Sequence, residues 1–303
     1  MNPQPPVCLY HKNCLDGIAS AWIVWMYFEG DVDLFAIQYG DPIPDNLAGR
    51  DVFVVDFSFD AETTLMLDAI CHLTVLDHHK SAHEQYERML TLPGGRNLRG
   101  HINIDQTKSG VGVVWDNFYG SKPMPEQLKM VQDHDLWKFD MPFTKNWAMG
   151  TTSYPANDIE AFDRIMRRPV LQIAEEGGAL LRKHLMDVDK IAKGVRFINI
   201  DGVEFAAINA NSHYRNELGD ALGKKYPAVA VYFDGRDRRI FSLRSPKVGG
   251  VDTTKFSEAF GGGGHANASA FSIEFTDRRF RNSHVKLRSK GYYWRKLKSL
   301  IGF

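Results

Sequence analysis

The chain has 303 residues, 44% of them hydrophobic, and carries 37 basic and 37 acidic side chains. This length suits about two domains, each long enough to bury its own core. Because the formal charge is balanced, whole-protein charge gives no argument for a nucleic-acid or membrane partner. The partners must therefore be inferred from motifs.

The cysteine content predicts a reduced protein, since Cys8, Cys14 and Cys71 are too few, and odd in number, for a disulfide framework. Residues 1–6 lack the charged and apolar regions of a secretory signal, and no apolar run approaches the ~18 residues of a membrane span. We therefore expect a soluble, cytoplasmic protein without a transmembrane segment. The sequence leaves open whether it is a monomer or a homodimer.

The first half of the chain alternates short apolar runs with amphipathic segments, which is typical of βαβ units around a parallel sheet. The run at 52–55 is apolar at every position, as expected for a strand with both faces covered. Asp60 can cap the helix that follows it, with Glu62 in the first turn. We predict strands over 7–10, 32–37, 52–55 and 72–76, and helices over 18–28, 60–70, 109–118 and 125–132.

A helical stretch and then a second strand-rich unit follow. Apolar residues recur at helical spacing between 155 and 194, and Gly194 can end that helix. Asp201-Gly202 is a strong signal for a two-residue hairpin turn. We predict strands over 195–200, 203–208, 228–233, 240–244 and 269–275, and a helix over 252–260. The expected fold is α/β, with a Rossmann-like parallel sheet in residues 1–150, a helical connector in 151–194, a smaller α/β domain in 195–276 and a basic, aromatic tail in 277–303.

Three of the apolar runs end in residues that can bind a metal ion. Asp77-His78-His79 ends one run, His11 and Asp16 follow another, and Asp56 follows a third. Since ligands bind at the carboxyl ends of parallel strands, we expect these side chains to meet at one edge of the sheet. Alone, His11 or Asp56 would be an ordinary turn or capping residue, but their common placement favours a carboxylate–imidazole metal site. Asp133, after a helical stretch, would complete a site for two ions.

These ordered motifs resemble those of the DHH phosphoesterase superfamily, which is named after the Asp-His-His found here at 77–79. The segment 261–270, GGGGHANASA, is similar to the GGGH segment of the DHHA1 domain, which pairs with DHH domains in nucleotide-cleaving members. The resemblance covers nearly the whole chain, from Leu9 to about Phe275. It implies a catalytic DHH domain followed by a substrate-binding DHHA1 domain.

The resemblance also implies the chemistry of the site. The chain would hydrolyse a phosphoester at a centre of two divalent metal ions, of which Mn²⁺ is favoured and Mg²⁺ or Co²⁺ are acceptable. His79 is expected to contact the scissile phosphate, and Asp77 to orient a histidine. Asp56 would bridge the ions. The implied metal ligands are His11, Asp16, Asp56, His78 and Asp133.

The glycine-rich segment has a physical reading that agrees with substrate binding. Consecutive glycines let backbone N–H groups approach an anion closely, and a flexible hinge is the alternative. His265 adds a hydrogen-bond donor. Arg244 ends a strand, and its planar guanidinium can donate two parallel hydrogen bonds to a phosphate. The expected substrate-binding residues are Arg244, Gly262, Gly263, Gly264 and His265. Ser109, Asn209 and Asn211 are further candidates, with plain turn residues as the alternative for the asparagines.

One departure from the family pattern lies in the first motif, which usually carries two aspartates after the histidine. Asn13 stands near the first of these positions, and a neutral amide is a poorer metal ligand than a carboxylate. Asn13 is therefore a candidate ligand for a weakly occupied metal position, and Asp16 is the safer ligand.

Three functions stay open on the sequence. The first is an enzyme that releases mononucleotides from short RNA or DNA oligonucleotides, or cleaves linear dinucleotides. The second is a phosphohydrolase for 3′-phosphoadenosine-5′-phosphate or polyphosphate, although the GGGH segment argues against polyphosphate. The third is a non-catalytic nucleotide sensor, suggested by Asn13. The tail could track a phosphate backbone or lie on a membrane surface, or simply be a solvated terminus.

Overall fold

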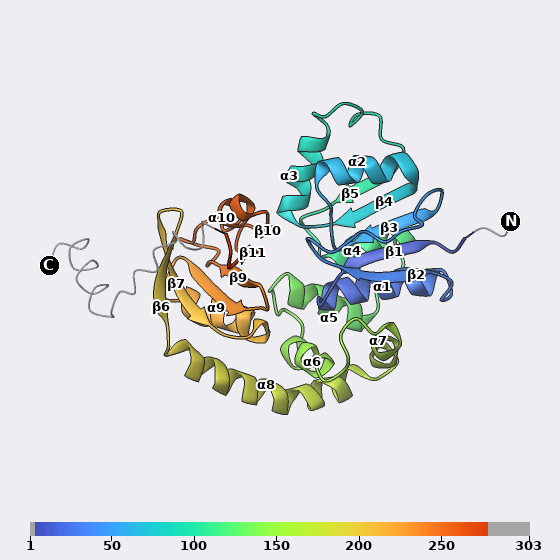
Figure 1. Ribbon diagram of the computed structural model, residues 1–303. Coiled ribbons are helices and arrows are strands. Elements are labelled where there is room, and N and C mark those ends of the chain that lie inside the picture. Colours follow the sequence, from blue (N-terminus) through green and yellow to red (C-terminus); the bar gives the residue numbers. More distant parts are fainter. Residues whose placement is uncertain (1–3, 278–303) are drawn as a thin grey trace. The chain divides into compact units, whose positions relative to one another are not determined.

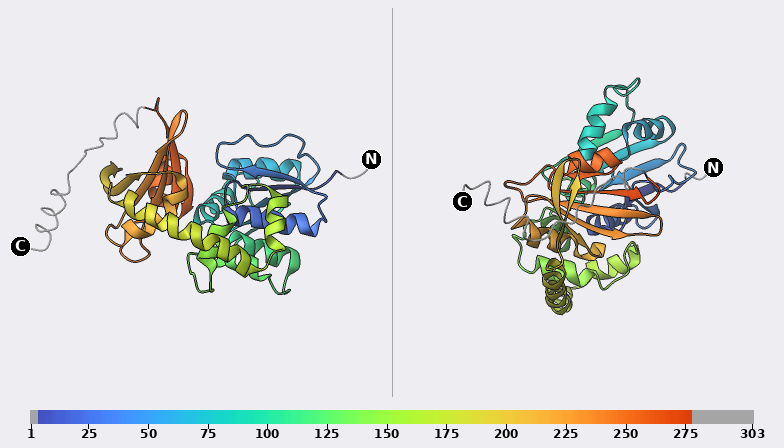
Figure 2. Two further views of the ribbon diagram at one scale, coloured as in Figure 1. Left: turned by 90° about the horizontal axis from the view of Figure 1, so that it is seen from below. Right: turned by 60° about the vertical axis from the view of Figure 1, so that its left-hand side comes forward.

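The computed structural model describes residues 4–277 (Figures 1 and 2). The basic tail therefore lies outside the described residues. The chain divides into two compact units, Met1–Arg182 and Lys183–Phe303, called here the N-terminal and C-terminal units. Among the described helices, none is both long and apolar enough to cross a membrane.

The N-terminal unit contains a five-stranded sheet whose neighbouring strands are all parallel, in the order β2-β1-β3-β4-β5. This confirms the parallel α/β sheet expected from the sequence. The central strands are mostly buried, whereas edge strand β2 alternates between more and less exposed positions. The strands are β1 (Val7–His11), β2 (Asp33–Ile37), β3 (Asp51–Val55), β4 (His72–Asp77) and β5 (His101–Ile104).

Helices cover both faces of this sheet. Cys8 and Tyr10 point to one face, where they pack in a core with α1, α4 and α5. Val7 and Leu9 point to the other face and pack with α2, as the two-residue period of a strand requires. The helices of this unit are α1 (Leu15–Tyr27), α2 (Ala61–Ile70), α3 (Lys80–Met89), α4 (Gly110–Tyr119), α5 (Glu126–Asp135), α6 (Thr144–Thr151) and α7 (Ile159–Met166), and α8 (Val170–Ala192) contains the boundary between the units.

The strand order changes direction next to β1. From β1 the chain adds β2 on one side and then returns to add β3, β4 and β5 on the other. At such a switch point the loops that follow β1 and β3 run to opposite sides and leave a crevice outside the carboxyl ends of these strands. Ligands of open α/β sheets bind in this crevice. The end of β1 and the residue that follows β3 therefore flank the position where the fold itself predicts a site.

The C-terminal unit contains a six-stranded mixed sheet in the order β10-β11-β9-β8-β7-β6. Only the β7–β8 pair within it is parallel. The predicted hairpin turn is confirmed, with positive φ at Asp201 and Gly202. The elements are β6 (Arg196–Ile200), β7 (Val203–Asn209), η1 (Ser212–Tyr214), α9 (Arg215–Gly223), β8 (Val229–Asp234), β9 (Arg238–Arg244), α10 (Thr254–Ser257), η2 (Glu258–Phe260), β10 (Gly263–His265) and β11 (Ala268–Glu274).

Candidate metal centre

His11 and Asp56 approach each other at the switch point of the parallel sheet. His11 ends β1, Asp56 follows β3, and His11 Nδ1 lies 3.4 Å from Asp56 Oδ2. Both atoms are buried, and within residues 4–277 neither has a hydrogen-bond partner. Asp56 also adopts a left-handed backbone conformation, φ 52°, which is strained for a residue other than glycine. Strain and unpartnered buried atoms together are typical of a functional site.

His78 gathers a second group of carboxylates. Its Nε2 lies 3.1 Å from Asp56 Oδ1, 3.6 Å from Asp16 Oδ2 and 3.6 Å from Asp135 Oδ2. Asp16, Asp56 and His78 are each only 1% exposed. Burial alone would lower the pKa of His78, but the hydrogen bond to Asp56 and the charges of Asp135 and Asp16 outweigh it and hold that pKa well above its usual value.

Four groups of possible ligand atoms occur among the described residues, and two of these groups have no residue in common. The first cluster is His11, Cys14 and Asp56, and the second cluster is Asp16, His78 and Asp135. In each cluster the ligand atoms lie within 4.8 Å of one another. Asp56 Oδ2 faces His11 of the first cluster, while its Oδ1 faces His78 of the second. A carboxylate placed in this way can bridge two ions.

The spacing and charge of the clusters fit divalent metal ions. Two ligand atoms about 2.1 Å from a tetrahedral ion lie about 3.4 Å apart, which is close to the His11–Asp56 distance. Within the described residues, Asp16, Asp56 and Asp135 form ion pairs with histidines and with no lysine or arginine. Placing three carboxylates side by side, two of them buried, is costly without further positive charge. The donor set therefore suits two divalent cations.

Asp16 is held in place by the N-terminus of α4. Its carboxylate accepts hydrogen bonds from Ser109 Oγ (3.0 Å), Gly110 N (2.6 Å) and Val111 N (3.0 Å). Burial, followed by the charges of Asp56 and Asp135, nevertheless raises the pKa of Asp16 well above its usual value. Ser109, a candidate from the sequence, thus touches the centre through Asp16.

Gly110 is a residue of the centre that the sequence analysis missed. A Cβ atom at this position would lie 2.7 Å from both Cβ and Oδ1 of Asp56 and 2.9 Å from Asp16 Oδ2. Only glycine therefore allows the start of α4 to come this close to both carboxylates. Nothing in the linear sequence marks this contact, because Gly110 and Asp56 are brought together by the fold.

Asp77 orients the ring of His79 and also holds the backbone of His78. Its Oδ1 lies 2.7 Å from His79 Nδ1 and accepts a hydrogen bond from His78 N (2.7 Å), while Oδ2 accepts one from Ser58 Oγ (2.6 Å). Burial alone would raise the pKa of Asp77, but the charge and hydrogen bond of His79 outweigh it and hold that pKa far below its usual value. The His79 ring centroid lies 5.7 Å from that of His11, beside the centre.

Asp133, expected to be a metal ligand, instead stabilises a loop. Its carboxylate accepts hydrogen bonds from Asp140 N (2.8 Å), Met141 N (3.2 Å) and Thr144 Oγ1 (2.6 Å). Asp135 is the residue that approaches His78. Residues two positions apart in an α-helix point in directions about 200° apart around its axis. The carboxylates of Asp133 and Asp135 therefore face different surroundings.

Asn13, a candidate ligand from the sequence, lies outside both clusters, and its neighbour Cys14 belongs to the first cluster. Asn13 forms a reciprocal pair with Asn157, through Asn13 N to Asn157 Oδ1 (2.8 Å) and Asn157 Nδ2 to Asn13 Oδ1 (2.7 Å). Cys14 is the N-cap residue of α1, and its Sγ belongs to the first cluster. The spacing of the motif could have suggested Cys14, since it lies two residues before Asp16.

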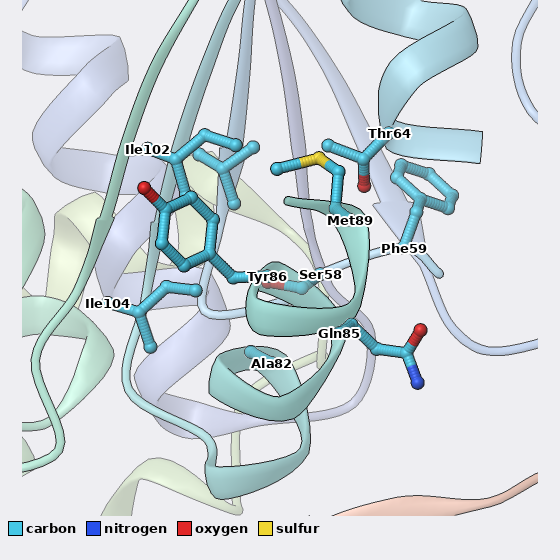
Figure 3. Close-up of a pocket in the computed structure, with 10 residues that line it drawn as sticks. Ser58, Phe59, Thr64, Ala82, Gln85, Tyr86, Met89, Ile102 and Ile104 are labelled. Carbon is cyan, nitrogen blue, oxygen red and sulfur yellow. The ribbon is translucent and has the colours of Figure 1, made fainter. Parts of the chain in front are cut away.

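A small pocket of the N-terminal unit is distinct from the metal clusters. It lies between β4, β5, α2 and α3, and Figure 3 shows Tyr86, Met89, Ile102 and Ile104 around it. Ser58, which donates to Asp77, also lines the pocket. Because its walls are mostly apolar, we interpret this pocket as a small packing gap in the core and not as a ligand site.

In the C-terminal unit, Arg244 ends β9 as predicted. Its guanidinium donates to Asn216 Oδ1 (2.7 Å) and Leu243 O (2.8 Å), and within the described residues it forms no ion pair. Desolvation and the nearby charge of Arg215 lower the pKa of Arg244 to about 9, so the group is still charged at neutral pH. A charged guanidinium without a carboxylate partner is suited to an anionic ligand.

The glycine-rich segment has a structural explanation of its own. A Cβ on Gly262 would lie 2.0 Å from Ala270 O, and one on Gly264 would lie 2.5 Å from Ala268 O. The glycines thus allow this segment to pack tightly against β11, which includes Ala270. Gly263 and His265 lie in β10. Asn209 ends β7, and Asn211 caps η1 by accepting a hydrogen bond from His213 N (3.1 Å).

Two curated proteins are similar to nearly the whole chain. It is 27% identical over 300 residues to "Uncharacterized protein R106" of Acanthamoeba polyphaga mimivirus, covering 89% of this chain and 68% of that protein. It is 23% identical over 301 residues to oligoribonuclease NrnB of Bacillus subtilis (strain 168), covering 88% of this chain and 72% of that protein. No model of a protein family matches the chain.

Two solved structures share the fold. One is the DHH domain of a protein described as a member of the s1p family of ribosomal proteins, with a TM-score of 0.54, 13% identity and coverage of 94% of this chain and 88% of that chain. The other is RecJ in complex with Mn²⁺ from Thermus thermophilus, with a TM-score of 0.50, 12% identity and coverage of 89% and 50%. At these identities the structures support the fold alone. The chain thus shares its fold with a DHH domain, and the parallel sheet gathers the ordered His/Asp motifs that resemble those of the DHH phosphoesterase superfamily.

Proposed function

We propose that the protein is a metal-dependent phosphodiesterase that hydrolyses short oligonucleotides or linear dinucleotides to mononucleotides. The observation that carries this proposal is Asp56, whose two carboxylate oxygens face two separate groups of metal-type ligands. The similarity to an oligoribonuclease supports the choice of substrate class.

The chemistry follows from the clusters. When bound, two divalent ions activate a water molecule as the nucleophile and stabilise the attacking and leaving oxygens of a phosphoester. His11, Asp16, Asp56, His78 and Asp135 would hold these ions. His79 lies beside them with its ring fixed by Asp77, so it is placed to contact the scissile phosphate.

We propose Mn²⁺ as an ion of this centre, with Mg²⁺ and Co²⁺ as alternatives. Carboxylate oxygens alone favour Mg²⁺ or Mn²⁺, and the addition of imidazole nitrogen from His78 shifts the preference toward Mn²⁺. The second cluster has this mixed composition. The solved RecJ structure of the same fold contains Mn²⁺.

The C-terminal unit is proposed to bind the part of the substrate that does not react. Arg244 offers a charged guanidinium that forms no ion pair within residues 4–277 and is held by Asn216. A phosphate that accepts from it would form a charge-assisted hydrogen bond. Such a contact would favour a nucleotide chain with more than one phosphate over a small phosphoester.

A substrate panel tests the proposal. Purified protein with Mn²⁺ is incubated with labelled RNA of increasing length, 3′-phosphoadenosine-5′-phosphate and polyphosphate, and the products are separated. We expect mononucleotides from RNA of two to five nucleotides, and no product in the presence of a chelator. Cleavage of polyphosphate alone would contradict the substrate class, and the absence of turnover on every substrate would favour a nucleotide sensor.

A further inference from the structure

The thiol of Cys14 lies among the ligand atoms of the metal centre. Cys14 is the N-cap residue of α1, and its Sγ lies within 4.8 Å of ligand atoms of both His11 and Asp56. The other two cysteines have ordinary surroundings. Cys8 lies in an apolar core, and Cys71 Sγ donates to Leu67 O at 3.1 Å. Cys14 therefore differs from them in facing polar, metal-type groups.

A second observation indicates that the space beside Cys14 takes a ligand. Asp56, which is 1% exposed, has Oδ2 buried without a hydrogen-bond partner among the described residues. The same holds for His11 Nδ1, only 3.4 Å away. A buried polar atom without a partner costs about 1–3 kcal/mol, and here two such atoms face each other. A cation between His11, Asp56 and Cys14 would satisfy both.

We propose that Cys14 Sγ is a metal ligand, so that the first cluster is a thiolate–imidazole–carboxylate site that selects Zn²⁺ or Co²⁺ over Mn²⁺. The second cluster, Asp16, His78 and Asp135, has only oxygen and imidazole donors and keeps its preference for Mn²⁺. The two positions of the centre would then hold different ions. This inference rests on the metal centre of the proposed function, but not on its substrate.

The chemistry of the thiol supports this assignment. A thiolate is a soft ligand that binds Zn²⁺ at about 2.3 Å and binds Mn²⁺ and Mg²⁺ poorly. On coordination, the Sγ–H proton leaves to solvent and an S–metal bond forms, so no oxidant or reductant is needed. Burial, followed by the charges of Asp56, Asp135 and Asp16, holds the pKa of the Cys14 thiol well above its usual value, so the proton would leave only on coordination.

Cobalt spectroscopy tests the proposal without measuring turnover. Metal-free protein is titrated with Co²⁺, and the near-ultraviolet sulfur-to-cobalt charge-transfer band is recorded together with the visible bands of the ion. We expect the charge-transfer band in the wild type and in Cys71→Ala, which changes a buried thiol outside both clusters. We expect Cys14→Ser to lose that band and keep visible bands from the remaining ligands.

Metal affinity gives the second readout. Loss of partners that merely orient a ligand lowers affinity about 10- to 100-fold, so removal of the thiolate should weaken Zn²⁺ binding at the first cluster by at least about 100-fold. Cys14→Asp should reverse the selectivity, gaining Mn²⁺ affinity while losing Zn²⁺ affinity. This variant keeps the test decisive if Cys14→Ser folds poorly.

The outcomes separate this inference from the proposed function. A wild-type cobalt complex without the charge-transfer band, or equal Zn²⁺ affinity in the wild type and Cys14→Ser, would overturn the role of Cys14 and leave the metal centre standing. Failure of the wild type to bind Zn²⁺, Co²⁺ or Mn²⁺ at all would overturn the metal centre, and both proposals with it.

Discussion

Asp133 and Asp135 are two residues apart, yet the structure gives their carboxylates different tasks. Asp133 accepts three hydrogen bonds from the segment 140–144, whereas Asp135, with a side chain 26% exposed, faces His78. The sequence could predict that a carboxylate near residue 134 binds the metal, but not whether it is Asp133 or Asp135. The hydrogen bonds that the segment 140–144 donates to Asp133 form only in the folded protein. Cys14 was missed for a related reason, since a cysteine at a helix start resembles an ordinary buried residue until His11 and Asp56 are placed around it.

This pair gives a matched test. Asp135→Asn should weaken metal binding at least about 100-fold with little change in stability, because it removes a charged ligand and not merely a partner that orients one. Asp133→Asn should keep metal affinity but lose about 1.5–3 kcal/mol of stability, since the amide satisfies its three donors less well than a charged carboxylate. Isothermal titration and denaturant unfolding measure the two quantities. The opposite pattern would restore Asp133 as the ligand.

A pH dependence follows from His78. The hydrogen bond to Asp56 and the charges of Asp135 and Asp16 outweigh burial and raise the pKa of His78, which favours the protonated ring in the metal-free protein. A metal ion needs the neutral ring, so binding must release this proton and affinity must fall as the pH falls. Titration calorimetry in buffers of different ionisation enthalpy should show proton release at pH 7. Metal binding without proton release would contradict the state assigned to His78.

At the scale of elements, the sequence predicted the strands that carry ligands because apolar runs of β-branched residues are strong signals. It did not predict β5, α3, α6, α9 or β10. The segment of α3, KSAHEQYERM, is mostly polar, and β5 has four residues and no buried position. Such elements form because they pack beside elements with a stronger apolar pattern, so their own residues do little to predict their secondary structure. The chain order of β1, β3 and β4 nevertheless sufficed to place three ligand groups at one sheet edge.

The start of α4 makes a prediction at this scale. Gly110→Ala would push a Cβ against Asp56 and Asp16, which must then move apart or displace the helix. We expect metal affinity to fall at least tenfold, together with a loss of about 1–3 kcal/mol of stability for an overpacked site. Gly223→Ala, at the end of α9, is the control, because its Cβ would meet nothing closer than 3.8 Å. Equal metal affinity in the two variants would show that α4 does not position the carboxylates.

For the whole molecule, the central prediction is a division of labour between the two units. Arg244→Ala should lower kcat/KM for oligonucleotides about ten- to a hundredfold, since a charge-assisted hydrogen bond contributes about 1.5–3 kcal/mol. Hydrolysis of bis-p-nitrophenyl phosphate, which has no second phosphate, should be almost unchanged. Arg239→Ala is the control, because Arg239 pairs with Asp234 on the same sheet.

The comparison of substrates makes this test specific. Equal slowing of both substrates by Arg244→Ala would place the arginine at the chemical centre instead. Arg244→Lys keeps the charge but loses the bidentate geometry of the guanidinium, so it should lower kcat/KM for oligonucleotides by an intermediate amount. The sequence could predict Arg244 from its place at a strand end. The close packing of Gly219 against its side chain, where a Cβ would lie 2.5 Å from Cγ, emerges only from the fold.

Counting bound ions in Asp56→Ala tests the account most directly, because Asp56 is the residue shared by the two groups of ligands. Metal-free protein is dialysed against Co²⁺, which accepts both thiolate and carboxylate ligands, and bound ions are counted per chain. We predict two ions in the wild type and in the surface control Asp116→Asn, and at most one weakly held ion in Asp56→Ala. Two tightly bound ions in a folded Asp56→Ala protein would contradict a centre built around this carboxylate.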